Sequence, residues 1–343
     1  MKPVFIIAEA GVNHNGDLQM AKELIDIAAD AGADAVKFQT YISEKVMTRY
    51  VGKARYQAAN TGCEGTHLEM SKKLELSFDD FRQLKEYCDH VGIMFLSTPF
   101  DFPSVDFLEP LVPAYKIPSG EITNLPLLEH VARKHKPIIM STGMSDLMEV
   151  ERAVKLIQSV QQSAPSKMFA PLTLLHCTSN YPTAFRDANL KAIQTLRTHF
   201  NLPSGYSDHT VGIEAAIAAV ALGATVIEKH FTLDRNLPGP DHKASIEPQE
   251  LHNLIAAIRN IEAALGTGEK VMTSSESEIR AIARRSLIAA CDLKAGTVLT
   301  ANLLEIKRPG SGISPVDMDK VLGKRLKTDV REDEVITWDD LEL

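Results

Sequence analysis

The sequence has few cysteines and no long apolar run. Its four cysteines are scattered over 343 residues and form no CxxC pair, so the sequence indicates neither a disulfide framework nor a cysteine-based zinc site. No run approaches the length that spans a bilayer. The short apolar N-terminal run already contains Glu9 and lacks the features of a signal peptide. These absences predict a cytoplasmic protein with free thiols and no membrane partner.

Positive charge is also in short supply. Lys and Arg number 37 against 45 Asp and Glu, which gives a formal net charge of −8. A nucleic-acid partner would call for a basic face, so none is expected. Apolar residues make up 44% of the chain and charged residues 24%, an ordinary globular balance that can bury a large core.

Eight short β-like runs alternate with helical segments. The runs are rich in Ile, Val, Leu and Phe and mostly end in Ser, Thr or Gly, as buried parallel strands do. The helical segments have apolar residues on one face and end at glycines such as Gly32, Gly92 and Gly266. The strands are predicted at residues 4–11, 35–41, 93–99, 114–120, 137–143, 172–179, 204–210 and 225–232.

Eight βα repeats in this length predict an α/β fold, a closed (β/α)8 TIM barrel over residues 1–266. An open doubly wound sheet is the alternative, although no GxGxxG follows the first strand. Residues 42–76 interrupt the alternation with a polar and aromatic insertion. In a barrel this insertion would lie over the catalytic face, as a lid or a dimer contact.

The character of the chain changes after residue 266. Residues 267–284 form a polar, charged linker, and residues 285–343 are short strands and turns. Within them DLKAGTVLTANLLE (292–305) echoes DVREDEVITWDDLE (329–342). This echo predicts a small β-rich C-terminal domain with internal pseudo-symmetry.

Two histidines, His209 and His230, stand at the ends of the last two predicted strands. Catalytic groups of a barrel lie at these ends. Strand alternation places Ser207 on the face of His209 and Glu228 on the face of His230. Two inward histidines on neighbouring strands can bind a divalent cation, and Mn²⁺, Fe²⁺, Co²⁺ or Zn²⁺ would suit them better than Ca²⁺. The alternative is two unrelated polar residues at strand ends.

Two lysines and four hydroxyl groups form a second set of strand-end residues. Ammonium and hydroxyl groups together favour a phosphate or carboxylate site. A lysine in a barrel strand could instead form a Schiff base, or a salt bridge to Glu9 or Glu121. In the loop after the last strand, Asp241 is either a contact for a polar substrate or a solvated turn residue. The lysines and hydroxyl residues are Lys37, Lys116, Thr98, Ser119, Ser141 and Ser207.

The chain resembles the sialic acid (nonulosonic acid) synthases through motifs that run in order over nearly its whole length. The resemblance implies a barrel followed by an antifreeze-like SAF domain of the β-clip type, and a domain-swapped homodimer in which that domain covers the partner's barrel mouth. The motifs are FIIAEAGVNHNGD, GADAVKFQTY, FLSTPFD, YKIPSGEITNLPLL, STGM, LLHCTSNYPT, GYSDHT, IEKHFTLD, GPDHKAS and KRPGSGISP.

The resemblance also implies roles for single residues. His209 and His230 would bind a divalent metal, usually Mn²⁺, with Mg²⁺ or Co²⁺ as alternatives. Glu9 would contact the sugar or help to activate it, and Lys116 would take part in catalysis. Either the metal or Glu9 would position and deprotonate the attacking water. Phosphoenolpyruvate would contact Lys37, Thr98, Lys116, Ser119, Ser141, Ser207 and Ser179, the last of which departs from the Asn of some members. The sugar would contact Gln39, Glu121, Tyr181, Asp241 and, from the other subunit, Arg308.

The implied reaction is a metal-dependent condensation of phosphoenolpyruvate with an open-chain N-acetylated hexosamine, with release of phosphate by C–O cleavage. With N-acetylmannosamine the product would be N-acetylneuraminate, the preferred hypothesis. With 2,4-diacetamido-2,4,6-trideoxymannose it would be N,N'-diacetyllegionaminate. Two more distant alternatives are a Schiff-base aldolase on the same barrel and a non-catalytic carbohydrate-binding protein.

Overall fold

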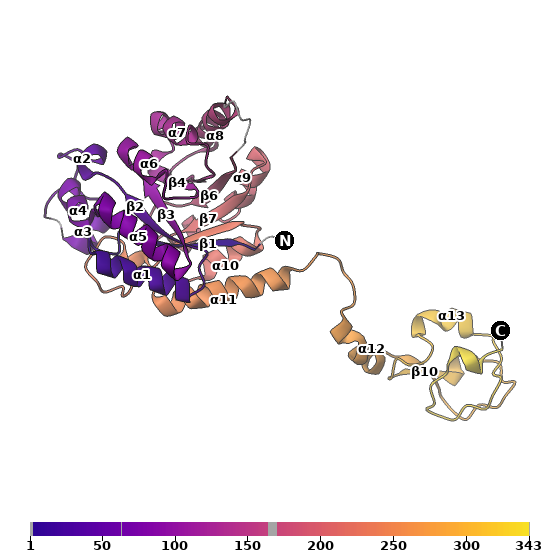
Figure 1. Ribbon diagram of the computed structural model, residues 1–343. Coiled ribbons are helices and arrows are strands. Elements are labelled where there is room, and N and C mark those ends of the chain that lie inside the picture. Colours follow the sequence, from indigo (N-terminus) through magenta and orange to yellow (C-terminus); the bar gives the residue numbers. More distant parts are fainter. Residues whose placement is uncertain (1–2, 63, 164–169, 343) are drawn as a thin grey trace. The chain divides into compact units, whose positions relative to one another are not determined.

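The computed structural model describes residues 3–62, 64–163 and 170–342. The chain forms two compact units, residues 1–266 and 267–343 (Figure 1). Among the described residues, no helix combines the length and the apolarity that crossing a bilayer requires.

The first unit is a barrel of eight parallel strands, which confirms the predicted fold class. The sheet runs in the order β3-β2-β1-β8-β7-β6-β5-β4, and its two end strands β3 and β4 also contact each other. Each strand lies within the run predicted for it. Their bounds are β1 Phe5–Gly11, β2 Ala35–Thr40, β3 Met94–Pro99, β4 Tyr115–Ile117, β5 Ile138–Ser141, β6 Leu172–Cys177, β7 Ser204–Asp208 and β8 Val226–His230.

A helix follows each strand, and end signals in the sequence set its length. Helix α5 begins after Ser77, whose hydroxyl accepts a hydrogen bond from the Asp80 amide, and ends at Gly92, whose φ of 89° is left-handed. The barrel helices are α1 Leu18–Asp30, α5 Phe78–Val91, α6 Phe102–Leu108, α7 Leu125–Ala132, α8 Leu147–Gln162, α9 Ala192–Phe200, α10 Glu214–Ala221 and α11 Pro248–Leu265.

The barrel interior has an apolar layer, followed by a polar layer that lies nearer the C-terminal ends of the strands. Side chains alternate along a strand, so the residue two positions after each apolar one points inward as well. Ile7 is thus followed by Glu9, and Val226 by Glu228. The apolar layer consists of Ile7, Ala35, Leu96, Ile139, Leu175 and Val226; the corresponding later residues are Glu9, Lys37, Thr98, Ser141, Cys177 and Glu228.

The insertion after β2 folds into three short helices: α2 Ser43–Val46, α3 Arg55–Thr61 and α4 His67–Leu74. Thr66 caps α4 and Glu69 closes the reciprocal capping box. Met70 and Leu74 of α4 pack with Val12 and Tyr41 in a small apolar cluster. This cluster holds the insertion against the C-terminal ends of β1 and β2.

The second unit is a small β-rich domain with its own core. It contains helices α12 Ser277–Ala283 and α13 Met318–Val321 and an antiparallel pair, β9 Ser286–Ala289 and β10 Leu304–Lys307. The two segments that echo each other pair through Leu293 and Val330, which exchange hydrogen bonds of 2.7 and 2.9 Å. Each also carries a 3-10 turn at the corresponding place, Ala301–Leu303 and Trp338–Asp340. Helix α12 lies within the segment predicted as a linker.

Candidate active site

One cavity of about 360 Å³ opens at the C-terminal ends of the barrel strands and brings most of the predicted site residues together. Strand register places Glu9 beside Lys37 on β2 and beside His230 on β8. Ser207 lies beside Glu228 in the same way. The predicted residues that line the cavity are Glu9, Lys37, Gln39, Thr98, Lys116, Ser119, Ser141, Ser179, Tyr181, Ser207, His209 and His230.

Buried charges of opposite sign meet on the floor of the cavity. Lys37 Nζ lies 2.6 Å from Glu9 Oε2 and 3.7 Å from Glu228 Oε2. Lys116 Nζ lies 3.4 Å from Glu228 Oε1, which also accepts a 2.9 Å hydrogen bond from Ser207. Isolated ions would be costly to bury here, and mutual pairing offsets that cost.

The two carboxylates have opposite protonation behaviour. Burial raises the pKa of Glu9 to about 7, even though Lys37 opposes the shift. Burial would also raise the pKa of Glu228, but the ammonium groups of Lys116 and Lys37 outweigh it and lower that pKa well below its usual value. Glu228 is therefore a fixed anion, whereas Glu9 can hold or release a proton near neutral pH.

Hydroxyl groups and one glycine form a small cradle beside the lysines. Lys116 donates a 2.8 Å hydrogen bond to Ser141, and the Gly143 amide donates one of 2.9 Å to Ser119. A Cβ at Gly143 would lie 2.4 Å from Ser179 Oγ and 2.8 Å from Ser119 Oγ. Only glycine therefore leaves these hydroxyl groups free to converge. With two ammonium groups near by, the cradle can accept a phosphate or a carboxylate.

The two histidines meet at the rim with a ring-centroid separation of 5.5 Å. His209 Nδ1 donates a 2.8 Å hydrogen bond to the carbonyl of Thr178, because a carbonyl can only accept. This tautomer leaves Nε2 with a free lone pair. Burial lowers the pKa of both imidazoles, and His230 Nδ1 is buried without a hydrogen-bond partner.

These two neutral imidazoles fit a divalent cation such as Mn²⁺ or Co²⁺. Within residues 3–62, 64–163 and 170–342, no group of three His, Cys, Asp or Glu side chains is placed to hold a metal. A cation bound by His209 and His230 would therefore take its other ligands from water and substrate.

A buried ion pair fixes the strand ends that carry the histidines. On the outer face, Lys229 Nζ lies 2.7 Å from Asp208 Oδ2 and donates a 2.8 Å hydrogen bond to the carbonyl of Thr210. Asp208 in turn accepts hydrogen bonds from the amide and the hydroxyl of Thr210. Strands β7 and β8 are thus clamped together next to His209 and His230.

Three predicted residues do not line this cavity. Asp241 lines an adjoining pocket of about 210 Å³, which shares Gln39, Tyr181 and His230 with it. Glu121 lies half-buried in a 3-10 turn and accepts a 2.7 Å hydrogen bond from Asn124. Arg308 belongs to the second unit, where its side chain donates to the carbonyl of Ala283. A contact between Arg308 and a sugar stays a prediction.

The structure adds residues that the sequence had not placed in the site. For Glu228, the sequence indicates only a strand-end position on the face of His230. Tyr56, Gln57 and His67 come from the insertion and line the cavity. Tyr56 stacks on Tyr181, with the ring centroids 5.3 Å apart, and Tyr181 packs against His209. The insertion therefore lies over the catalytic face, as expected.

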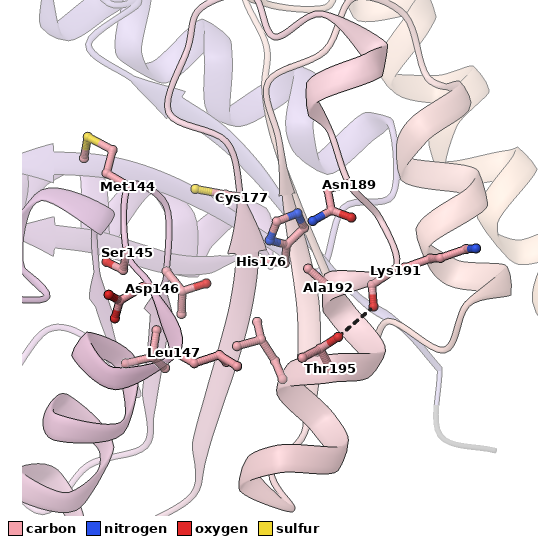
Figure 2. Close-up of a pocket in the computed structure, with 13 residues that line it drawn as sticks. Met144, Ser145, Asp146, Leu147, His176, Cys177, Asn189, Lys191, Ala192 and Thr195 are labelled. Atoms are coloured by element: carbon pink, nitrogen blue, oxygen red, sulfur yellow. Dashed lines mark hydrogen bonds between the residues drawn. The ribbon is translucent and has the colours of Figure 1, made fainter.

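A second cavity of about 530 Å³ lies on the outer side of β6 (Figure 2). It is lined by the loop from Thr142 to Leu147 on one side and by the start of α9 on the other. His176 faces this cavity, and its Nε2 donates a 2.8 Å hydrogen bond to the carbonyl of Ala188. It therefore belongs to a different face from His209 and His230.

Known protein families match both units of the chain. Residues 24–270 match the NeuB family and residues 284–342 match the SAF domain. The N,N'-diacetyllegionaminic acid synthase of Legionella pneumophila is 50% identical over 98% of this chain and 94% of its own length. The human N-acetylneuraminate-9-phosphate synthase is 37% identical over 97% of this chain and 91% of its own.

A solved structure shows the same architecture. The N-acetylneuraminic acid synthetase of Leptospira borgpetersenii, crystallised with citrate, is 42% identical and superposes with a TM-score of 0.70. The match covers 81% of this chain and 90% of that one. The chain therefore belongs to the NeuB family, the sialic (nonulosonic) acid synthases, and is an enzyme with a C-terminal SAF domain.

Proposed function

We propose that the enzyme condenses phosphoenolpyruvate with the open-chain form of an N-acetylated hexosamine, to give a nine-carbon 2-keto-3-deoxy sugar acid and phosphate. The observation that carries the proposal is the pairing of an anion cradle with two converging imidazoles in one cavity. The names of the relatives, which are nonulosonic acid synthases, support the same reaction.

The anion cradle suits phosphoenolpyruvate, which carries a phosphate and a carboxylate. Lys37 and Lys116 would offset these charges, and Thr98 and Ser141, which already accept hydrogen bonds from the lysines, would add hydroxyl contacts. In the reaction C3 of the enol attacks the aldehyde carbon, and phosphate departs with the oxygen from C2. The lysines would stabilise the growing charge on that phosphate.

His209 and His230 would hold a divalent metal, proposed as Mn²⁺ with Mg²⁺ or Co²⁺ as alternatives. When bound, such a cation polarises the aldehyde oxygen as a Lewis acid. The protein itself presents two neutral imidazoles on β7 and β8, which the ion pair between Lys229 and Asp208 holds together. Glu9 lies next to His230 in register, and with a pKa of about 7 it can take a proton from the water that adds to C2.

Two sugars are candidates for the acceptor. N-acetylmannosamine would give N-acetylneuraminate, and 2,4-diacetamido-2,4,6-trideoxymannose would give N,N'-diacetyllegionaminate. The name of the relative that is 50% identical favours the second sugar. The swapped homodimer, in which Arg308 would reach the partner's barrel, and a cytoplasmic location stay predictions.

Phosphate release from phosphoenolpyruvate tests the proposed function. Reactions with Mn²⁺ would contain either sugar or none, each with and without EDTA. We expect release that needs a sugar and stops with EDTA. Release without any sugar, or trapping of the enzyme on a keto substrate by borohydride, would instead indicate different chemistry, such as a Schiff-base aldolase.

A further inference from the structure

Tyr181, in the loop after β6, packs against both imidazoles that would bind the metal. Its ring centroid lies 4.1 Å from that of His209, with an angle of 37° between the ring planes. It lies 5.7 Å from that of His230, and the two rings meet edge-on at 88°. Aromatic rings this close pack directly against each other. The position of Tyr181 therefore constrains the orientation of both histidine rings.

Packing matters for these rings because hydrogen bonds fix only part of their orientation. His209 Nδ1 donates to the carbonyl of Thr178. His230 Nδ1 has no hydrogen-bond partner among the residues that the structure describes. A metal-binding histidine is usually held in place by a hydrogen bond from its second ring nitrogen. For His230, the contact with Tyr181 supplies part of that restraint.

Tyr181 is itself held by the insertion after β2. Tyr56, the second residue of α3, stacks on Tyr181 with the ring centroids 5.3 Å apart and an angle of 26° between the ring planes. Tyr56 is half-buried and lines the same cavity as the two histidines. A chain of ring contacts therefore runs from the insertion through Tyr181 to His209 and His230.

Helix α3 has little buried surface of its own. Of its seven residues, all of which the structure describes, Gln57 alone is buried. Asn60 donates a 2.6 Å hydrogen bond to the carbonyl of Pro240, in the loop after β8. A segment with so few buried side chains can separate from the rest of a protein at a low free-energy cost. Helix α3 can thus exchange between a docked and an undocked position.

We infer, on the basis of the metal site in the proposed function, that Tyr56 is a positioning residue for the metal ligands. With α3 docked, the stacked rings of Tyr56 and Tyr181 hold His209 and His230 in the arrangement that accepts a cation. With α3 undocked, these rings turn more freely, and ordering them on metal binding costs more entropy. Because coupling between two equilibria is reciprocal, metal binding must favour the docked position of α3 by the same factor.

Calorimetric titration with Mn²⁺, without substrates, would measure the effect of Tyr56 on metal binding. Tyr56→Ala removes the stacked ring, so its Kd for Mn²⁺ should rise about tenfold, the lower end of the effect of losing a contact that orients a metal ligand. Tyr56→Phe keeps the ring and should bind Mn²⁺ like wild type. Tyr50→Ala is the matched control, because Tyr50 belongs to the same insertion but is 88% exposed; it should also bind like wild type.

Hydrogen exchange followed by mass spectrometry would measure the reciprocal effect. In the wild-type protein, saturating Mn²⁺ should slow exchange of the backbone amides of α3 by about tenfold, the same factor as the change in Kd. In Tyr56→Ala, Mn²⁺ at a concentration that saturates the variant should leave this exchange unchanged. A role of Tyr56 in folding alone would not link exchange in α3 to the metal. If circular dichroism shows that Tyr56→Ala is unfolded, Tyr56→Leu would replace it.

The outcomes separate this inference from the proposed function. If wild type binds Mn²⁺ and the folded variant without the ring binds it with the same Kd, Tyr56 does not position the metal ligands. Exchange in α3 that does not respond to Mn²⁺ in wild type would overturn the inference as well, as would an equal loss of affinity in Tyr56→Phe. If wild type does not bind Mn²⁺, the metal site of the proposed function fails, and the inference fails with it.

Discussion

Lys116 on β4 and Glu228 on β8 meet across the barrel interior, with 3.4 Å between Nζ and Oε1. Both are buried, and Lys37 joins them from β2. The two lysines that would bind phosphoenolpyruvate thus share one permanent carboxylate. Glu228 keeps them protonated and in place before the substrate arrives.

Removal of that carboxylate should make phosphoenolpyruvate binding depend on pH. Burial lowers the pKa of Lys116, and Glu228 opposes the shift. In Glu228→Gln the pKa of Lys116 should fall further, so its ammonium form is lost as pH rises. We expect KM for phosphoenolpyruvate to rise more steeply with pH in the variant than in wild type, because the ammonium form of Lys116 is then lost at a lower pH. Steady-state kinetics of both proteins at several pH values would show this, and equal pH profiles would contradict it.

The cradle at Gly143 should not tolerate a methyl group. In Gly143→Ala the new Cβ would crowd Ser119 Oγ and Ser179 Oγ, so KM for phosphoenolpyruvate should rise at least about tenfold, the effect of losing one or two hydrogen bonds to a charged group. Gly52→Ala is the control, because a Cβ there meets nothing within 4 Å. An unchanged KM in a folded Gly143→Ala protein would show that phosphate binds elsewhere.

Glu9 should make the stability of the barrel depend on pH. Because its pKa is raised from 4.5 to about 7 in the folded state, the folded protein holds this proton more tightly than the unfolded chain. Its protonation stabilises the fold fully below pH 4.5, and this contribution is lost as the pH rises to 7. Glu9→Gln avoids this loss. The free energy of unfolding of the variant, relative to that of wild type, should therefore rise by on the order of 3 kcal/mol between pH 4.5 and 8.

Urea unfolding followed by far-UV circular dichroism would measure this gain. The single tryptophan, Trp338, belongs to the second unit, so the barrel itself contains no tryptophan to follow by fluorescence. A stability difference between Glu9→Gln and wild type that stays constant over this pH range would rule out a raised pKa for Glu9.

Metal binding should depend on the two inward histidines and not on the outward one. His209→Ala and His230→Ala should each weaken Mn²⁺ binding at least about a hundredfold, as expected for loss of one of two protein ligands. His176→Ala, which removes a histidine from the outer face of the neighbouring strand, should bind Mn²⁺ like wild type. Isothermal titration calorimetry without substrates would compare them. Undiminished Mn²⁺ binding by His209→Ala or His230→Ala would place the metal elsewhere.

The predicted domain swap can be tested by complementation. In a swapped homodimer, one site of an Arg308→Ala and His209→Ala heterodimer receives both defects and the other receives none. Random subunit exchange should therefore restore about a quarter of wild-type activity. If the mixture stays as inactive as either variant after exchange, Arg308 does not act on the partner's barrel.

Much of the site could be predicted because strand residues alternate. Once Ile7 and Val226 are taken as inward-facing, Glu9, Glu228 and His230 must also face inward, and the barrel brings their strands together. The central position of Glu228 could not be predicted, because it depends on which strands lie opposite each other across the barrel. The spacing of residues along the sequence does not give the distance between strands on opposite sides of the barrel.

The sequence pattern predicts the insertion and the second unit less well than it predicts the barrel strands. Residues 42–76 have no single periodicity, so the sequence did not indicate that Tyr56, Gln57 and His67 would line the cavity. Helix α12 lies in a polar stretch that does not indicate a helix. It contacts the turn after β10, where the Gly310 amide donates a hydrogen bond to the carbonyl of Ala281. Its position depends on tertiary contacts more than on local pattern.

The fate of the bridging oxygen of phosphoenolpyruvate shows which bond the enzyme breaks. The enzyme would be given Mn²⁺, the diacetamido sugar and phosphoenolpyruvate labelled with ¹⁸O between C2 and phosphorus, and the released phosphate would be analysed by mass spectrometry. We expect the label to leave with phosphate, because the C2–O bond breaks and water supplies the new oxygen at C2. Label retained in the sugar acid, with unlabelled phosphate, would mean that the P–O bond breaks and would contradict the proposed reaction.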